Sequence, residues 1–121
     1  MQIKIKATNI NLTPEIENYI NKRLNFLDKF VKDDSGALCQ VEVGRTTFHH
    51  KKGEVFRAEV NLTTVGRSLY AATEGEDLYS AIDGVKSEIK NRVLSFKEKK
   101  ETLLKRGGRQ VKLILKGIWR K

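Results

Sequence analysis

The chain has 121 residues, 24 of them lysine or arginine and 15 aspartate or glutamate, which gives a formal net charge of +9. One cysteine excludes an internal disulfide, and two histidines with one cysteine are a poor ligand set for zinc. The sequence has neither the apolar run of a signal peptide nor a stretch apolar enough to span a membrane, so we expect one cytoplasmic domain.

The N-terminal segment predicts a strand followed by a helix. Residues 2–7 alternate between apolar and polar side chains, which is typical of a strand with one buried face. Thr13 and Pro14 have the residue types of an N-cap and of the first helical position. The buried side of this helix is predicted to carry Ile16, Ile20, Leu24, Leu27 and Val31. The sequence DDSG at 33–36 is expected to end it.

Three further strands are predicted at 37–43, 54–65 and 67–73. The segment 45–53, RTTFHHKKG, is expected to be a loop, and Val65-Gly66 a tight turn. Cys39 falls on the buried side of its strand, which favours a core cysteine. Because the strands alternate, the sheet should be covered on one face only.

A second helix is predicted from about Asp77 to about Lys100. The elements together predict a two-layer α/β sandwich of order β-α-β-β-β-α, in which two helices cover one face of a four-stranded mixed sheet. The first two strands should pair in parallel through a right-handed crossover. Glu74, Glu76 and Asp77 stand at the start of the second helix, where carboxylates cap free N–H groups.

Nothing in the sequence predicts an enzyme. The glycines form no phosphate-binding loop, and the pair His49-His50 lies in a predicted loop without an obvious carboxylate or cysteine partner. We therefore assign no catalytic residue, no metal site and no cofactor.

Basic side chains align on both predicted helices. At about 100° per residue, Tyr79, Lys86, Lys90 and Lys97 fall within a stripe of roughly 40°. If the helices lie side by side, the two rows form a surface suited to a phosphate backbone. The alternative is a solvated helix face with lysines lying along apolar surface. The row on the first helix comprises Asn18, Lys22, Asn25 and Lys29, with Arg23 near Tyr19 and Phe26 at the margin of the core.

The segment EGEDLYSAIDGV at 74–85 closely resembles the E-G-x-D-[LM]-Y-x-A-I-D motif of the ribosome hibernation-promoting factors, also called the sigma-54 modulation or S30EA ribosomal family. The resemblance includes the opening MQIKI, LTPEIENYINKRL and HHKKGEVFRAEVNL, and covers residues 1 to about 100. Many relatives differ at three positions by carrying Lys in place of Phe26, Lys in place of Glu88 and Arg in place of Asn91.

The resemblance implies a fold similar to a double-stranded-RNA-binding domain. It implies docking in the decoding channel of the small ribosomal subunit, contact with rRNA, and silencing of translation under stress or in stationary phase. Arg23 matches the basic residue of the family's first helix, and Tyr79 matches the motif tyrosine. The expected rRNA-binding residues are Lys22, Arg23, Lys29, Tyr79, Lys86, Lys90, Arg92, Lys97 and Lys100.

We divide the chain into a ribosome-binding domain at 1–100 and a basic tail at 101–121. Residues 1–98 hold 15 basic and 14 acidic residues, and residues 99–121 hold nine and one, so the charges of +1 and +8 add to +9. Apolar residues in the tail fit an amphipathic helix. Two alternatives remain open: a general RNA-binding or RNA-chaperone module, and a protein that binds anionic membrane through the tail. We favour a monomer that binds no membrane.

Overall fold

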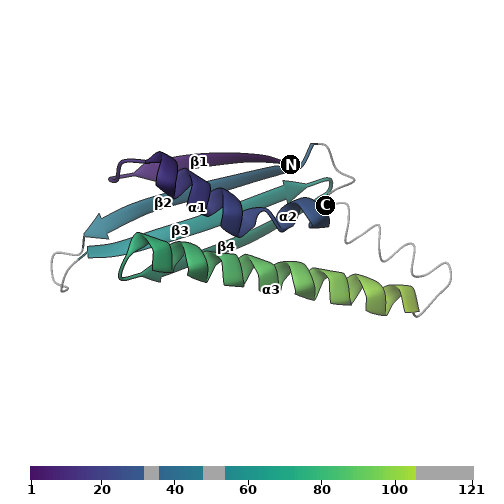
Figure 1. Cartoon of the computed structure of the whole chain (residues 1–121). Coiled ribbons are helices and arrows are strands. Elements are labelled where there is room, and N and C mark those ends of the chain that lie inside the picture. The colour runs from purple at the N-terminus through teal and green to yellow at the C-terminus, as the bar shows by residue number, and fades with distance from the viewer. Residues whose placement is uncertain (32–35, 48–53, 106–121) are drawn as a thin grey trace.

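The computed structural model describes residues 1–31, 36–47 and 54–105. The elements are, in order, β1 (Gln2–Thr8), α1 (Pro14–Leu24), α2 (Leu27–Phe30), β2 (Leu38–Thr47), β3 (Glu54–Thr64), β4 (Arg67–Gly75) and α3 (Leu78–Lys105). The helices lie on one face of a four-stranded sheet (Figure 1). The predicted two-layer sandwich and its element order are therefore confirmed.

The sheet has the strand order β1-β2-β3-β4. β1 pairs with β2 in parallel, and the other two pairs are antiparallel, as expected from the helical connection after β1. Gly66 has a positive φ of 72° in the turn between β3 and β4, a conformation that favours glycine. The expected tight turn at Val65-Gly66 is thus confirmed.

β2 continues beyond the predicted boundary of its loop. Arg45, Thr46 and Thr47 were expected in the loop, but they extend the ladder opposite Phe56, Val55 and Glu54. β-branched threonines suit such an extended, paired backbone. The His49-His50 pair lies outside the described residues.

The first predicted helix is divided in two. Between α1 and α2, Asn25 and Phe26 have ψ angles of −20° and −21°, values typical of a 3₁₀ turn. N–H groups three residues further on bond back to their carbonyls at 3.1 and 3.3 Å. Leu24 and Leu27 are both fully buried, since residues three positions apart lie on the same side of a 3₁₀ turn. The buried stripe reaches Val31 as predicted.

The core lies between the helices and the sheet. Its fully buried side chains alternate along β2 and β3 and recur at helical spacing in α1 and α3. Cys39 is among them, as expected, and burial raises the pKa of its thiol to about 11. The largest of these side chains are Ile20, Leu24, Leu27, Leu62, Ile82 and Ile89.

α3 has the predicted N-cap but a later end. The two carboxylate oxygens of Asp77 accept bonds from the Ser80 N–H at 2.8 Å and the Ser80 hydroxyl at 3.2 Å, which confirms Asp77 as the capping residue. The helix continues to Lys105 rather than ending near Lys100. Residues 101–105, ETLLK, contain neither glycine nor proline, and most of them favour helix.

Candidate nucleic-acid interface

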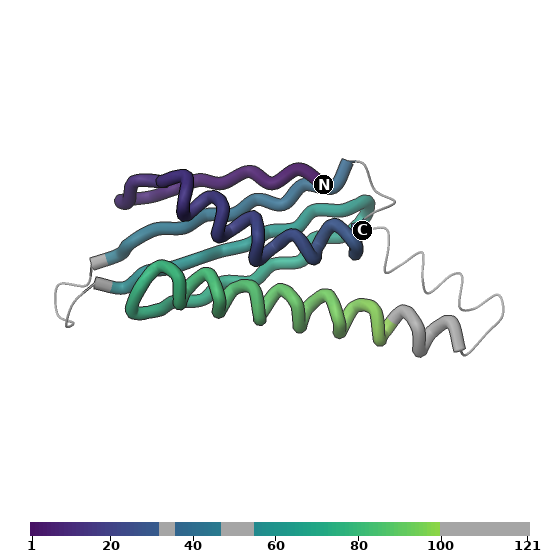
Figure 2. The backbone as a smooth tube through the Cα atoms, in the orientation of Figure 1, coloured from purple at the N-terminus to yellow at the C-terminus, as the bar shows by residue number. Residues whose placement is uncertain are grey.

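α1 and α2 run beside α3 in the same direction across the sheet, as the tube in Figure 2 shows. Two aromatic pairs join them along this line, which we call the helix seam. The rings of Tyr19 and Tyr79 meet edge to face with centroids 4.7 Å apart. Phe30 and Phe96 do the same at 6.0 Å. The seam thus brings residues 19–30 next to residues 79–96.

A charged network occupies the seam between these two aromatic pairs. Arg23 Nε lies 3.1 Å from Asp83 Oδ1, and a terminal nitrogen of Arg23 donates to the Tyr19 hydroxyl at 3.0 Å. That hydroxyl in turn donates to Asp83 Oδ1 at 2.6 Å. The guanidinium also lies 4.9 Å from the centre of the Tyr19 ring. Arg23 is therefore held by both helices.

The network raises the pKa values of Tyr19 and Arg23. The hydrogen bond to Asp83 raises the pKa of Tyr19, because losing the proton would place two anions together. The hydrogen bond to Tyr19, followed by the charge of Asp83, raises the pKa of Arg23. Tyr19 is thus a neutral donor and Arg23 a cation at physiological pH.

The Arg23 side chain is 40% exposed in spite of these contacts. A guanidinium has five N–H donors, of which one terminal nitrogen donates to Tyr19 while Nε forms the ion pair with Asp83. The remaining donors are available to an external acceptor. Phosphate oxygens suit them, because a planar guanidinium binds phosphate with two parallel hydrogen bonds.

The expected basic row on α3 lies along the same seam. We call Lys86, Lys90 and Lys97 the basic row; Lys90 and Lys97 are exposed and Lys86 is half-buried. Tyr79 is 41% exposed and stands one turn before Asp83. Lys22 in α1 and Lys29 in α2 are exposed as well. The arrangement combines mobile ammonium groups, one fixed guanidinium and a tyrosine ring.

Two expected residues lie apart from the row. At 3.6 residues per turn, Arg92 points to the opposite side of α3 from Lys86 and Lys90. Lys100 belongs to α3, but its side chain is outside the described part.

Tyr19 and Asp83 are the members of the network that the sequence did not identify. The sequence placed Tyr19 only near Arg23 at the margin of the core, and it indicated no role for Asp83. The pairs Tyr19–Arg23 and Tyr79–Asp83 each have the i, i+4 spacing of neighbours on a helix. That spacing was the available signal, although it does not show that the two pairs meet.

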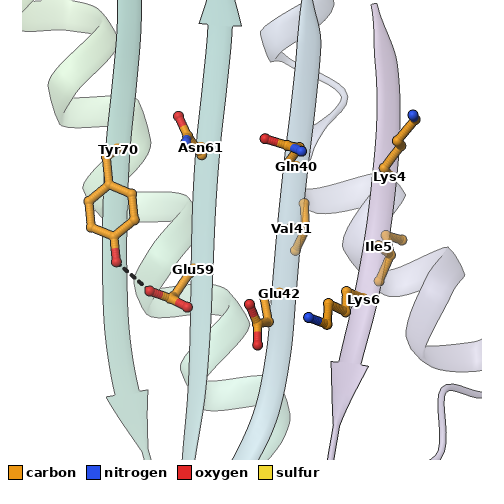
Figure 3. Close-up of a pocket in the computed structure, with 9 residues that line it drawn as sticks. All are labelled: Lys4, Ile5, Lys6, Gln40, Val41, Glu42, Glu59, Asn61 and Tyr70. Atoms are coloured by element: carbon orange, nitrogen blue, oxygen red, sulfur yellow. Dashed lines mark hydrogen bonds between the residues drawn. The ribbon is translucent and has the colours of Figure 1, made fainter.

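The open face of the sheet provides a second polar surface, shown in Figure 3. It contains a shallow hollow of about 330 Å³ in which Lys4 and Lys6 share the surface with Glu42 and Glu59. The hydroxyl of Tyr70 donates to Glu59, whose pKa is lowered chiefly by this bond. With two carboxylates beside two lysines, this face suits a polyanion less well than the helix seam does.

The described residues contain no group of three or more histidine, cysteine, aspartate or glutamate side chains placed to hold a metal ion. Among the helices in the described part of the chain, none has the length and apolar character needed to cross a membrane.

Comparison with known proteins agrees with the fold and the motif. The sequence pattern of the family described as Sigma 54 modulation protein / S30EA ribosomal protein matches residues 3–101. The chain is 25% identical over 99 residues to the ribosome hibernation promoting factor of Klebsiella oxytoca. This alignment covers 82% of the chain and 96% of that protein.

Two other similarities differ in their extent. The chain is 25% identical over 97 residues to the ribosome hibernation promotion factor of Staphylococcus aureus (strain COL), covering 80% of this chain but only 48% of that protein. The crystal structure of the Thermus thermophilus Protein Y N-terminal domain superposes with a TM-score of 0.66 at 26% identity. That superposition covers 79% of this chain and 99% of the domain.

Proposed function

This chain belongs to the Sigma 54 modulation protein / S30EA ribosomal protein family, and from that membership we propose that it is a ribosome hibernation factor. The family consists of ribosome-binding factors rather than enzymes, in agreement with the sequence. We propose further that the chain binds small-subunit rRNA in the decoding channel and silences translation in the cytoplasm under stress or in stationary phase.

The observation that carries the rRNA-binding proposal is the position of Arg23 beside the basic row. Lys86, Lys90 and Lys97 provide spaced positive charge, and Arg23 provides a fixed fork that is partly open to solvent. Such a surface follows a phosphate backbone without reading bases. Tyr79 adds an exposed ring that can pack against a ribose or a base.

Inhibition on this proposal needs no chemical step. A domain seated where messenger and transfer RNA normally lie prevents their binding for as long as it remains there. The effect is reversible and depends on the affinity for the subunit, which in turn falls with salt.

The direct experiment is a competition between the full chain and transfer RNA for vacant small subunits, together with sedimentation of cell lysate. We expect the chain to travel with subunits or ribosomes and to displace transfer RNA in a concentration-dependent manner. Tight binding without displacement contradicts the decoding-channel site. Equal affinity for unrelated RNA, with no sedimentation at the ribosome, supports the RNA-chaperone alternative instead.

We keep the division into a ribosome-binding domain at 1–100 and a basic tail at 101–121 as a proposal. α3 passes through this boundary to Lys105, so the first residues of the tail extend the helix. Residues 106–121, with most of the predicted amphipathic segment, lie outside the described residues.

A further inference from the structure

A second hollow, which we call the β4 hollow, lies between β4 and the C-terminal half of α3. Its volume is about 460 Å³. It shares Phe96 with the helix seam and Tyr70 with the hollow on the open sheet face. Of its described lining, Arg92 alone was expected to bind rRNA. Its lining comprises Arg67, Ser68, Leu69, Tyr70, Arg92, Ser95, Phe96 and Lys99.

The charge of the β4 hollow has a single sign. Arg67, Arg92 and Lys99 are the charged residues in its described lining, and no carboxylate stands among them. Ser68 and Ser95 also line the hollow. In contrast, the hollow on the open sheet face combines two lysines with two glutamates. Of these two hollows, the β4 hollow is the one with the lining of an anion site.

Arg67 is held in place without an anionic partner among the described residues. Its guanidinium carbon lies 5.0 Å from the centre of the Phe96 ring, and Phe96 itself packs edge-on against Phe30. The Nε atom of Arg67 is buried and has no hydrogen-bond partner in the described part of the chain. Within that part Arg67 forms no ion pair, unlike Arg23 and Arg57. Burying part of a cation without an anionic partner costs free energy, and a bound anion would offset that cost.

We propose that the β4 hollow is a binding site for a phosphate group, held by Arg67 and Arg92 as guanidinium donors and by Lys99 as an ammonium donor at the rim. Arginine and lysine are side chains that proteins commonly use to bind phosphate. The phosphate belongs either to an RNA backbone or to a free phosphorylated molecule, since the chemistry is the same.

The cations of this site lie apart from the basic row of the proposed rRNA surface. Arg92 and Lys99 lie on the side of α3 opposite Lys86 and Lys90. Arg92 was expected within the rRNA-binding set. The proposal instead places it beside Arg67 as a second donor to the same phosphate. It also stands whether or not the helix seam binds the ribosome.

The test is a titration of the full-length protein with inorganic pyrophosphate at constant ionic strength. Binding is monitored by the NMR chemical shifts of the Ser68 and Ser95 backbone amides. We expect saturable shifts. Arg67→Met, which keeps the packing on Phe96, should weaken binding roughly tenfold or more, because it removes charged hydrogen bonds. Lys99→Met at the exposed rim should weaken it less without affecting the fold, and Lys4→Met on the open sheet face should not change it.

A second arm identifies the source of the phosphate by measuring the salt dependence of small-subunit binding for wild type and Arg67→Met. If the phosphate is part of RNA, the log–log slope should decrease by about 0.7 to 0.9 in the variant. If the slope is unchanged while pyrophosphate binding is abolished, the ligand is a free phosphorylated molecule. Shifts that do not saturate, or equal pyrophosphate affinity in wild type and in a folded Arg67→Met protein, overturn the proposal.

Discussion

Asp83 is an acidic residue among basic ones on a surface proposed to bind a polyanion. Its carboxylate holds Arg23 and the Tyr19 hydroxyl, so we interpret it as the residue that positions the guanidinium. The negative charge of Asp83 and its role in positioning Arg23 predict opposite effects on rRNA binding when Asp83 is replaced. Loss of a negative charge should strengthen binding to rRNA, whereas loss of a fixed Arg23 should weaken it.

We predict that Asp83→Asn lowers affinity for the small subunit by roughly three- to tenfold, the cost of ordering one long side chain on binding. The measurement is an equilibrium binding curve with vacant small subunits. Glu88→Gln, which removes an exposed carboxylate from the same helix, should leave affinity unchanged or slightly raise it. If Asp83→Asn binds more tightly than wild type, the loss of negative charge affects affinity more than the loss of a positioned Arg23. That result would contradict the positioning role of Asp83.

The carboxyl of Glu59, on the open sheet face, should make the fold less stable at acid pH. Hydrogen bonds from Tyr70, and less strongly from Arg57, lower the pKa of its carboxyl. Because the pKa is lower in the folded protein, the ionised carboxylate stabilises the fold in full above the unfolded-state pKa of about 4.3. This stabilisation is lost as the pH falls through the folded-state pKa.

Glu59→Gln should therefore flatten the decrease of Tm below about pH 5 and lower Tm at neutral pH. Tyr70→Phe should give a weaker effect of the same kind. Parallel curves of Tm against pH for wild type and Glu59→Gln would show that the hydrogen bonds do not shift this carboxyl.

The candidate site was only partly predictable at the residue scale. Arg23, Tyr79 and the basic row followed from helical periodicity and from the motif. The role of Asp83 required knowing that α1 and α3 lie side by side with Tyr19 between them, which no local pattern contains. The role of Arg67 was missed for the same reason, because Arg92 and Lys99, which line the same hollow, belong to α3 and not to β4.

At the scale of elements, Gly84 sets the distance between α3 and β4. A Cβ atom at this position would lie 2.9 Å from Thr73 Oγ1 and 3.2 Å from its Cβ. Thr73 has little freedom to move, since its hydroxyl donates to the Ala81 carbonyl at 2.7 Å and its side chain is β-branched. The glycine is therefore required by close packing of helix on strand.

We predict that Gly84→Ala lowers the free energy of unfolding by about 1 kcal/mol. Overpacking typically costs about 1 to 3 kcal/mol, which exceeds the roughly 1 kcal/mol gained by replacing glycine within a helix. Urea denaturation measures the difference. Combining Gly84→Ala with Thr73→Ala should cost less than the sum of the two single changes; a stabilised Gly84→Ala would mean that the helix moves away without cost.

The elements themselves were predicted well where the pattern was long. Alternation located β1, β3 and β4, and the crossover rule gave the parallel pair. The break between α1 and α2 was missed because the spacing of Leu24 and Leu27 fits an α-helix and a tighter turn alike. The end of α3 was missed because Leu103 and Leu104 continue a helical composition without a stop signal.

For the whole molecule, charge is distributed so that the domain is nearly neutral and the C-terminal segment is strongly basic. Deleting residues 107–121 removes five basic and no acidic residues. We predict that the shortened chain unfolds at nearly the same temperature, because the buried core residues in the described part of the chain all precede position 97, while its ribosome affinity and salt slope decrease. Unchanged affinity and slope would exclude the tail from binding.

The central claim is that the helix seam, and not the open sheet face, contacts the small subunit. Two charge reversals test it: Lys86→Glu with Lys90→Glu on the seam, and Lys4→Glu with Lys6→Glu on the sheet. Each replaces two lysines, so each changes the net charge of +9 by −4, to +5. Non-specific attraction therefore weakens equally in both proteins.

The decisive measurement is the affinity of wild type and both folded variants for vacant small subunits over a series of salt concentrations. We predict that the seam variant binds far more weakly than wild type and has a smaller salt slope, by about 0.7 to 0.9 for each phosphate that it no longer neutralises. The sheet variant should remain close to wild type. Equal weakening of the two variants, or a greater weakening of the sheet variant, would contradict the account.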